Sequence, residues 1–251
     1  MARKSTHFGA IAVSLAAAAA GATALAAPAG AATSAKKSYT AALKAASNEG
    51  VHYLSTATEQ GTSIRLEGDT GLSNGAETLT LRKGTLDESL AVTLIGSTGY
   101  LKGNAAALTR ILGLSSTEAD AHASRWLSFP SSNTTLAQLV SGLLDKDVAS
   151  ELEIDGPYSF GKATSVDGQS ATAIRGTVSA SSGTTVPVVL YIQSTGSHRP
   201  IEEVTNPGKS AKVIEGTVTF TKWGEKKHFS APSSSTSLLA LSQTDTTTTG
   251  G

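Results

Sequence analysis

The residues of this sequence that could do chemistry are few and widely spaced. Nucleophilic hydrolysis needs a Ser that a base and an orienting acid activate. Ser34 and Lys37 have the Ser-x-x-Lys spacing, but this spacing is expected by chance in a chain so rich in Ser. Two carboxylates from distant strands could cleave a glycosidic bond, but carbohydrate clefts display aromatic platforms and only 5% of these residues are aromatic. We therefore expect no catalytic residues and a protein that is not an enzyme.

Metal sites need His, Cys or carboxylate side chains that converge from neighbouring positions. The chain contains no Cys, and its five His residues are scattered, with no H-x-x-x-H pair. Asp145 and Asp147 lack the dense run of oxygen ligands that a calcium loop requires. The formal net charge is zero, and no basic stripe is interleaved with aromatic residues as in nucleic-acid-binding proteins. We expect no metal ion, no cofactor and no nucleic-acid partner.

The first residues have the composition of a secretory signal peptide. Arg3 and Lys4 precede an apolar run over 8–27, and Ala29-Gly30-Ala31 supplies the small-x-small step at which such peptides are cleaved. The run is mostly Ala and Gly, which is too weakly hydrophobic to anchor the chain in a bilayer. We expect a signal peptide over 1–31 and a protein that is secreted or held in the cell envelope without a lipidated Cys.

The rest of the chain predicts one domain over 32–232 and a tail. A helix over 33–47 is followed by strand-like segments with alternating apolar residues, each closed by Gly, Asn or Asp. Ser73-Asn74-Gly75 and Asp167-Gly168 are hairpin signals, and hairpins make a sheet antiparallel. Residues 233–251 are rich in Ser and Thr and cannot bury enough apolar surface to become ordered. We therefore expect a disordered tail, with weak docking of Leu238, Leu239 and Leu241.

The middle of the chain predicts helices. Asn104 can cap a helix that ends before Gly113, and Ser115 with Glu118 has the spacing of a capping box. A third helix, capped by Ser132 or Asn133, has the strongest amphipathic pattern. Its apolar stripe is made by Leu136, Leu139, Val140, Leu143 and Leu144. With about ten strands wrapped around these helices, the predicted fold class is α+β with an antiparallel sheet.

The apolar stripe of the third helix allows two interpretations. The helix can fill the space beside the sheet as an ordinary packed core. Alternatively, helix and sheet can enclose an apolar cavity, which is a usual place for a small-molecule site. Every amphipathic element needs a packing partner, so the residues alone favour the filled core.

Five fragments of the chain resemble a known family when they are taken in order. They are Val51-His52-Tyr53-Leu54, Tyr100-Leu101-Lys102-Gly103, Arg125-Trp126-Leu127, Phe220-Thr221-Lys222-Trp223-Gly224 and Phe229-Ser230-Ala231-Pro232. Together they resemble the LppX/LprG-type lipoproteins of mycobacteria and other actinobacteria, whose fold is related to that of the LolA and LolB lipoprotein carriers. The resemblance covers 38–232. The chain departs from the family because it lacks the lipidated Cys.

The resemblance implies a curved, half-open antiparallel barrel whose concave face, closed by helices, holds the acyl chains of lipids or lipoproteins. On this chain the cavity would be lined by one face of the segments 89–95 and 184–193 and by the insert helices. Nine candidate residues are chosen by their period within those segments: Leu90, Val92, Leu94, Leu139, Val140, Leu143, Val188, Leu190 and Ile192.

The expected function is therefore the non-catalytic binding or carrying of lipid acyl chains by an exported monomer. Its partner would be a lipid or a lipid-modified molecule, with transient contact to the membrane. The alternative is a cell-surface interaction or sensor module whose interior is filled by side chains and holds no lipid.

Overall fold

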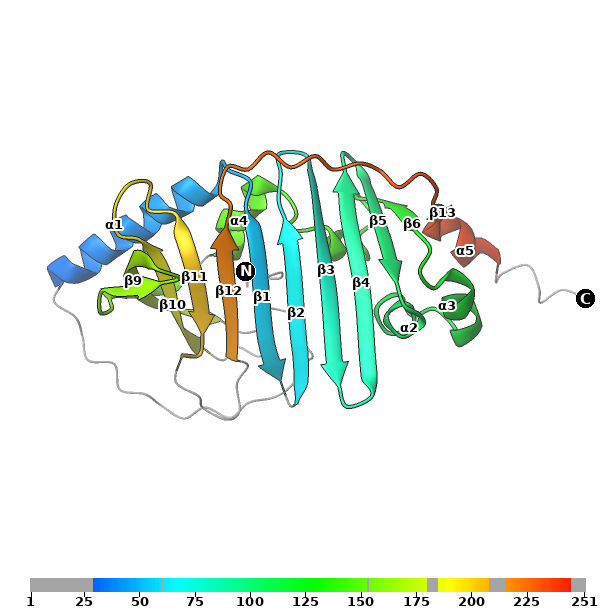
Figure 1. Cartoon of the computed structure of the whole chain (residues 1–251), viewed down its shortest axis with the longest axis horizontal. Coiled ribbons are helices and arrows are strands. Elements are labelled where there is room, and N and C mark those ends of the chain that lie inside the picture. The colour runs from blue at the N-terminus through cyan, green and yellow to red at the C-terminus, as the bar shows by residue number, and fades with distance from the viewer. Residues whose placement is uncertain (1–28, 60, 153, 180–184, 208–214, 245–251) are drawn as a thin grey trace, which may run out of the picture.

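One large sheet organises the chain in the computed structural model (Figure 1). The structure describes residues 29–59, 61–152, 154–179, 185–207 and 215–244. The strands are β1 (His52–Glu59), β2 (Thr62–Asp69), β3 (Asn74–Lys83), β4 (Leu86–Ile95), β5 (Thr98–Gly103), β6 (Leu127–Pro130), β7 (Asp155–Phe160), β8 (Thr164–Val166), β9 (Gln169–Ser179), β10 (Thr185–Gln193), β11 (Pro200–Thr205), β12 (Glu215–Thr221) and β13 (Thr236–Ser237).

The strand order is β13-β6-β5-β4-β3-β2-β1-β12-β11-β10-β9-β7, with β8 paired to β9. Every pairing is antiparallel except that of β13 with β6. The predicted α+β class with an open, curved antiparallel sheet is confirmed, with thirteen strands among the described residues instead of about ten. Residues 228–231 form no strand and belong to the long connection from β12 to β13.

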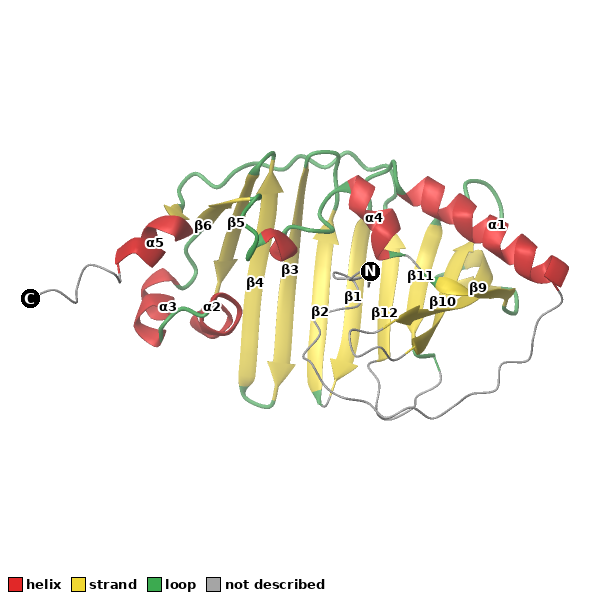
Figure 2. Cartoon of the chain, turned by 180° about the vertical axis from the view of Figure 1, so that it is seen from behind, coloured by secondary structure: helices red, strands yellow, loops and turns green. Residues whose placement is uncertain are grey.

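The helices of the described residues pack on one face of this sheet, which we call the inner face (Figure 2). They are α1 (Ala29–Ala46), α2 (Ala105–Leu112), α3 (Ser116–His122), α4 (Asp145–Glu151) and α5 (Leu238–Thr244). Buried residues of α1 and α4 join β1, β2, β7, β9, β10 and β12 in a first apolar cluster. Buried residues of α2 and α3 join β4, β5 and β6 in a second cluster. The core is therefore divided between the two ends of the sheet.

Register identifies the residues that share the inner face, because alternate strand residues point to opposite sides of a sheet. One row of paired inner residues crosses from β4 to β9, and we call it the central row. Its members are Leu90, Leu79, Leu66, Ser55, Val218, Glu203, Leu190 and Ile174. Both clusters draw on this row, and Leu79 packs against both of them.

The local helix signals are confirmed. Asn104 Oδ1 accepts a hydrogen bond from the Ala107 amide at 3.0 Å, and Gly113 ends α2 with a φ of 70°. Ser115 and Glu118 form both hydrogen bonds of a capping box at the start of α3. These devices depend on residues three or four positions apart, which is why spacing alone predicts them.

The amphipathic helix predicted over 136–144 is wrong. The chain makes a single 3₁₀ turn there, η1 (Ala137–Leu139), and Gly142 then adopts a φ of 85°. The backbone of Leu143 lies against Gly75 of β3, so closely that a Cβ at Gly75 would overlap it. The apolar stripe therefore packs on the sheet as an irregular segment, and the regular helix α4 begins only at Asp145.

The disordered tail predicted over 233–251 is also wrong as far as Thr244. β13 pairs with β6, and Leu238 and Leu241 of α5 pack against the second cluster. The average composition of the tail hides these apolar contacts. Residues 245–251, and residues 1–28 of the predicted signal peptide, lie outside the described residues.

Tyr53 fills the middle of the inner face by passing over a glycine. It is paired with Gly68 across β1 and β2, and its Oη donates a 2.7 Å hydrogen bond to Glu77 on the next strand. A Cβ at Gly68 would lie 2.5 Å from Tyr53 Oη and 2.8 Å from the Ala76 carbonyl oxygen. Only glycine lets the ring reach Glu77 in this position.

We expect Gly68→Ala to lower the free energy of unfolding by about 2 kcal/mol, because overpacking a filled site forces side chains and backbone to shift. Gly216→Ala on β12 is the matched control, since the nearest atoms to its new Cβ would be 3.7 and 3.8 Å away. The control should change stability by less than about 0.5 kcal/mol. Urea denaturation measures both variants, and equal losses would contradict the role of the Tyr53 contact.

Candidate functional site

The structure separates the nine predicted lining residues into two groups. Those from β4 and from the segment after β6 lie together in the second cluster: Leu90, Val92, Leu94, Leu139, Val140 and Leu143. Those from β10 lie in the first cluster: Val188, Leu190 and Ile192. The predicted single lining therefore consists of two sets at opposite ends of the sheet.

These side chains are packed against protein atoms. Leu143 and Leu190 are 0% exposed, and Leu139 alone of the nine is half-buried. A void large enough for a water molecule would leave accessible surface on the residues around it. The nine residues thus stabilise the fold in the state described here, and their contact with a lipid stays a prediction.

Partly exposed apolar side chains also occur on the inner face of the central strands, in the central row and in the inner row next to it. Ala57 on β1, Ile64 on β2 and Leu79 on β3 are half-buried. Ala57 is paired with Ile64 on one side and with Gly216 of β12 on the other. We call these four residues the inner floor.

The described atoms leave space above Gly216 on the inner face. A Cβ placed there would meet only Thr56 and Ala57 of the adjacent strand, and nothing from above the sheet. By contrast, a Cβ placed at Gly75 would overlap the backbone of Leu143. The irregular segment after β6 therefore covers the inner face at Gly75, whereas no described atom above the sheet lies within 4 Å of a Cβ at Gly216.

Two polar side chains border the inner floor along the central row. Ser55 and Glu203 are both paired with Val218, which lies between them. Glu203 is 8% exposed, and its Oε2 has no hydrogen-bond partner among the described residues. Burial, assisted by the nearby carboxylate of Glu151 on α4, raises the pKa of the Glu203 carboxyl to about 8. Near neutral pH this group is mainly a neutral acid that can both donate and accept a hydrogen bond.

A small polar pocket lies at the strand ends beside the turn that follows α1. Its volume is about 210 Å³, and it is lined by Gln169, Gln193, Arg199, Pro200, Ile201, Phe220, Thr221, Lys222 and Trp223. Arg199 is ion-paired at 2.5 Å with Glu49, and Trp223 Nε1 donates to the Pro200 carbonyl at 2.9 Å. This lining suits a small polar group better than a hydrocarbon tail.

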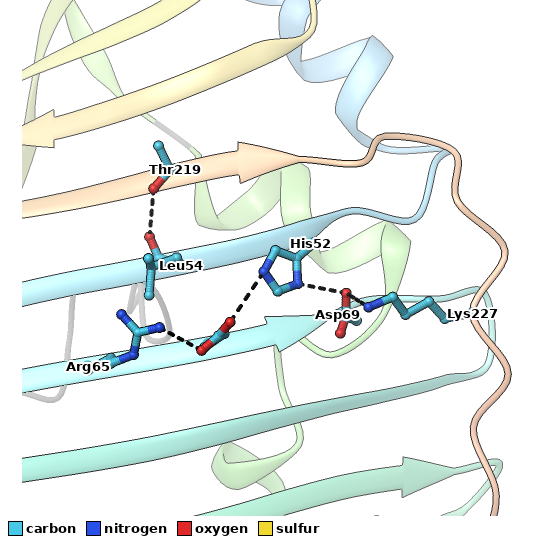
Figure 3. Close-up of polar contacts among 7 residues, drawn as sticks. His52, Leu54, Arg65, Asp69, Thr219 and Lys227 are labelled. Carbon is cyan, nitrogen blue, oxygen red and sulfur yellow. Dashed lines mark hydrogen bonds and ion pairs between the residues drawn. The ribbon is translucent and has the colours of Figure 1, made fainter. Parts of the chain in front are cut away.

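The outer face beneath the inner floor is polar (Figure 3). His52 Nδ1 and Lys227 Nζ lie 2.8 and 2.7 Å from the same Asp69 oxygen, and Arg65 pairs with Glu67 at 2.7 Å. These partly exposed pairs contribute little to stability. They place the β12–β13 connection against the end of β2, and they leave the inner face as the apolar side of the central strands.

The chain contains one motif that is typical of hydrolases and that was not among the predicted features. Gly71-Leu72-Ser73-Asn74-Gly75 has the Gly-x-Ser-x-Gly spacing of a nucleophile elbow. Such an elbow joins a strand to a helix, whereas these residues join the antiparallel strands β2 and β3. The segment is therefore part of the β2–β3 hairpin, as its turn residues predict.

Two further findings concern the described residues alone. No helix within them is long and apolar enough to cross a membrane. In the same stretch of the chain, no group of three or more His, Asp or Glu side chains is arranged to hold a metal ion.

The comparison with solved structures identifies the fold. The sequence matches no protein-family model, and no curated protein is significantly similar to it. The crystal structure of LprF from Mycobacterium bovis is similar over 80% of this chain and 97% of LprF, with a TM-score of 0.52 and 14% identity. The chain has the LprF fold. The lipoprotein LppX of Mycobacterium tuberculosis matches 79% of this chain and 99% of its own, with a TM-score of 0.49 and 15% identity.

The resemblance to the LppX/LprG-type lipoproteins is thus confirmed at the level of the fold. In this LprF-like sheet the half-buried residues of the inner floor lie on β1, β2, β3 and β12. Sequence periodicity did not indicate it, because Ala57 and Gly216 are too small to mark an apolar face.

The raised pKa of Glu203 predicts a pH-dependent stability. An unfolded Glu titrates near 4.5 and the native group at about 8, so the native state holds a proton that the unfolded state has lost between these values. The free energy of unfolding should fall as pH rises from 4.5 to 8, by up to about 1.4 kcal/mol per unit, and then level off. Glu203→Gln should lack this component. Urea denaturation of both proteins at pH 5.5, 6.5 and 7.5 checks it, and parallel profiles would contradict it.

Proposed function

We propose that this protein is exported and binds lipid acyl chains on the inner floor without catalysing a reaction. One observation carries the proposal. Half-buried apolar residues of β1, β2 and β3 lie side by side on the inner face, and a Cβ at Gly216 would meet no described atom above the sheet within 4 Å. An acyl chain laid there would cover Ala57, Ile64 and Leu79 and continue the apolar surface of both clusters.

The energetics of such a complex require no further chemistry. Transfer of a methylene group from water to an apolar environment gains roughly 0.8 kcal/mol. A dozen methylenes then supply roughly 10 kcal/mol before the cost of ordering the chain. Covering only part of the tail therefore suffices for useful binding.

The fold and the predicted leader support the same function. The chain shares its fold with LprF, and the resemblance to the LppX/LprG-type lipoproteins implies acyl chains on the concave face of such a sheet. The predicted signal peptide over 1–31 would place the protein where lipids of the envelope are available. With no Cys to carry a lipid anchor, the protein would have to shuttle or be held by a partner.

The burial of the predicted lining supports a second candidate, a cell-surface interaction module with a filled interior. Eight of the nine residues are at most 6% exposed, as expected for an interior filled by side chains. Native mass spectrometry of the protein secreted by its own host separates the two functions. Copurified lipid supports the lipid-binding protein, and repeatedly bare protein supports the interaction module.

We expect Ile64→Glu to reduce the affinity for a fluorescent fatty acid at least tenfold, because the new carboxylate must lose water when the tail covers it. Ser63→Glu is the matched control, since Ser63 is an exposed neighbour on the outer face of the same strand. Fluorescence titration measures both variants, and circular dichroism checks that both are folded. Similar losses in the two variants, or no loss in Ile64→Glu, would contradict binding on the inner floor.

A further inference from the structure

We infer that the lipid taken by the inner floor carries a neutral oxygen-bearing group, such as a hydroxyl, within reach of its tail, and that the Glu203 carboxyl binds this group. The inference rests on the proposed function and names the class of ligand. It makes Glu203 a specificity-determining residue at the edge of an otherwise apolar site.

The strand register places Glu203 close to Gly216 of the inner floor. Thr205 is paired with Gly216, and Glu203 with Val218, so that Glu203 is the diagonal neighbour of Gly216 on the inner face. Diagonal neighbours across an antiparallel pair are about 7–8 Å apart, which is within the reach of a Glu side chain and a ligand headgroup. Ser55 occupies the corresponding diagonal position on β1.

Stability does not explain a carboxyl group at this position. Glu203 is paired with Leu190 and Val218 in the first cluster, and it is 8% exposed. Its Oε2 has no hydrogen-bond partner among the described residues, and leaving a buried acceptor unpaired is costly. A leucine would fit the apolar row without this cost. A buried polar group that destabilises the unliganded fold is characteristic of a functional site.

The environment of Glu203 favours a neutral ligand group over a second anion. Glu151 on α4 adds like charge close to it, so a phosphate or carboxylate would be repelled. The burial that raises the pKa of Glu203 keeps it protonated near neutral pH. A protonated carboxyl can donate to an ester or hydroxyl oxygen and accept from a hydroxyl at the same time.

Two probes of nearly equal shape test the inference: dodecan-1-ol and 1-chlorododecane, each delivered from cyclodextrin and measured by displacement of a bound fluorescent fatty acid. The full chain should bind the alcohol about tenfold more tightly than the chloride, because only the alcohol can exchange hydrogen bonds with a buried carboxyl. Glu203→Leu should bring the two affinities within twofold of each other. Glu203→Gln, which keeps a donor and an acceptor, should retain most of the preference.

Thermal unfolding and a neighbouring carboxylate supply the controls. Glu203→Leu should be at least as heat-stable as the parent, so that its lost preference is not a folding defect. Glu202→Leu changes the adjacent residue, which faces the other side of β11, and should leave the preference intact. A lower melting temperature for Glu203→Leu would overturn the inference, because the carboxyl would then serve the fold.

The remaining outcomes separate this inference from the proposed function. Equal binding of the two probes by the parent protein would overturn the role of Glu203 while acyl-chain binding stands. Failure of the parent protein to bind either probe or the fatty acid would remove the proposed function itself.

Discussion

The pairing of β1 with β12 is the constraint on which the rest of the structure depends. It joins the strands that precede the helical middle of the chain to those that follow it, with a register that runs from His52 opposite Thr221 to Thr58 opposite Glu215. Ala57 and Gly216 are partners in this ladder, so the inner floor does not exist until the two halves meet. Contacts of such large sequence separation cost more loop-closure entropy than local ones, so the inner floor depends on the stability of this long-range pairing.

The inner face has two densely packed regions and a smaller group of half-buried residues. Large aliphatic side chains fill the two ends of the sheet beneath the helices, where burial supplies most of the stability. On β1 and β12, the paired residues Ala57 and Gly216 have almost no side chain, so that mainly backbone lies on the inner face there. Glu203 lies beside the inner floor, and its Oε2 has no hydrogen-bond partner among the described residues.

The sequence predicted what is local and missed what depends on distant close approaches. The caps at Asn104 and Ser115 and the antiparallel sheet follow from spacing and turn residues. The helix over 136–144 failed because its pattern carries no information about Gly75, whose missing side chain lets the backbone of Leu143 lie on the sheet. The open floor was missed because periodicity weights large apolar residues. The alternation of Ile201, Glu203 and Thr205 on one face was the available signal for the buried acid.

At the β6 edge of the sheet, residues near the C-terminus add a short further strand, β13. From β12 the backbone runs along the upper rim (Figure 1), is held by Lys227 at Asp69, and ends by covering β6 with the two residues of β13. An uncovered strand edge offers unpaired amides and carbonyls to any other extended peptide. The C-terminal segment thus pairs with part of an edge strand that would otherwise be free to pair with another extended peptide. A molecule clipped before Thr236 would expose β6 and could add copies of itself strand by strand.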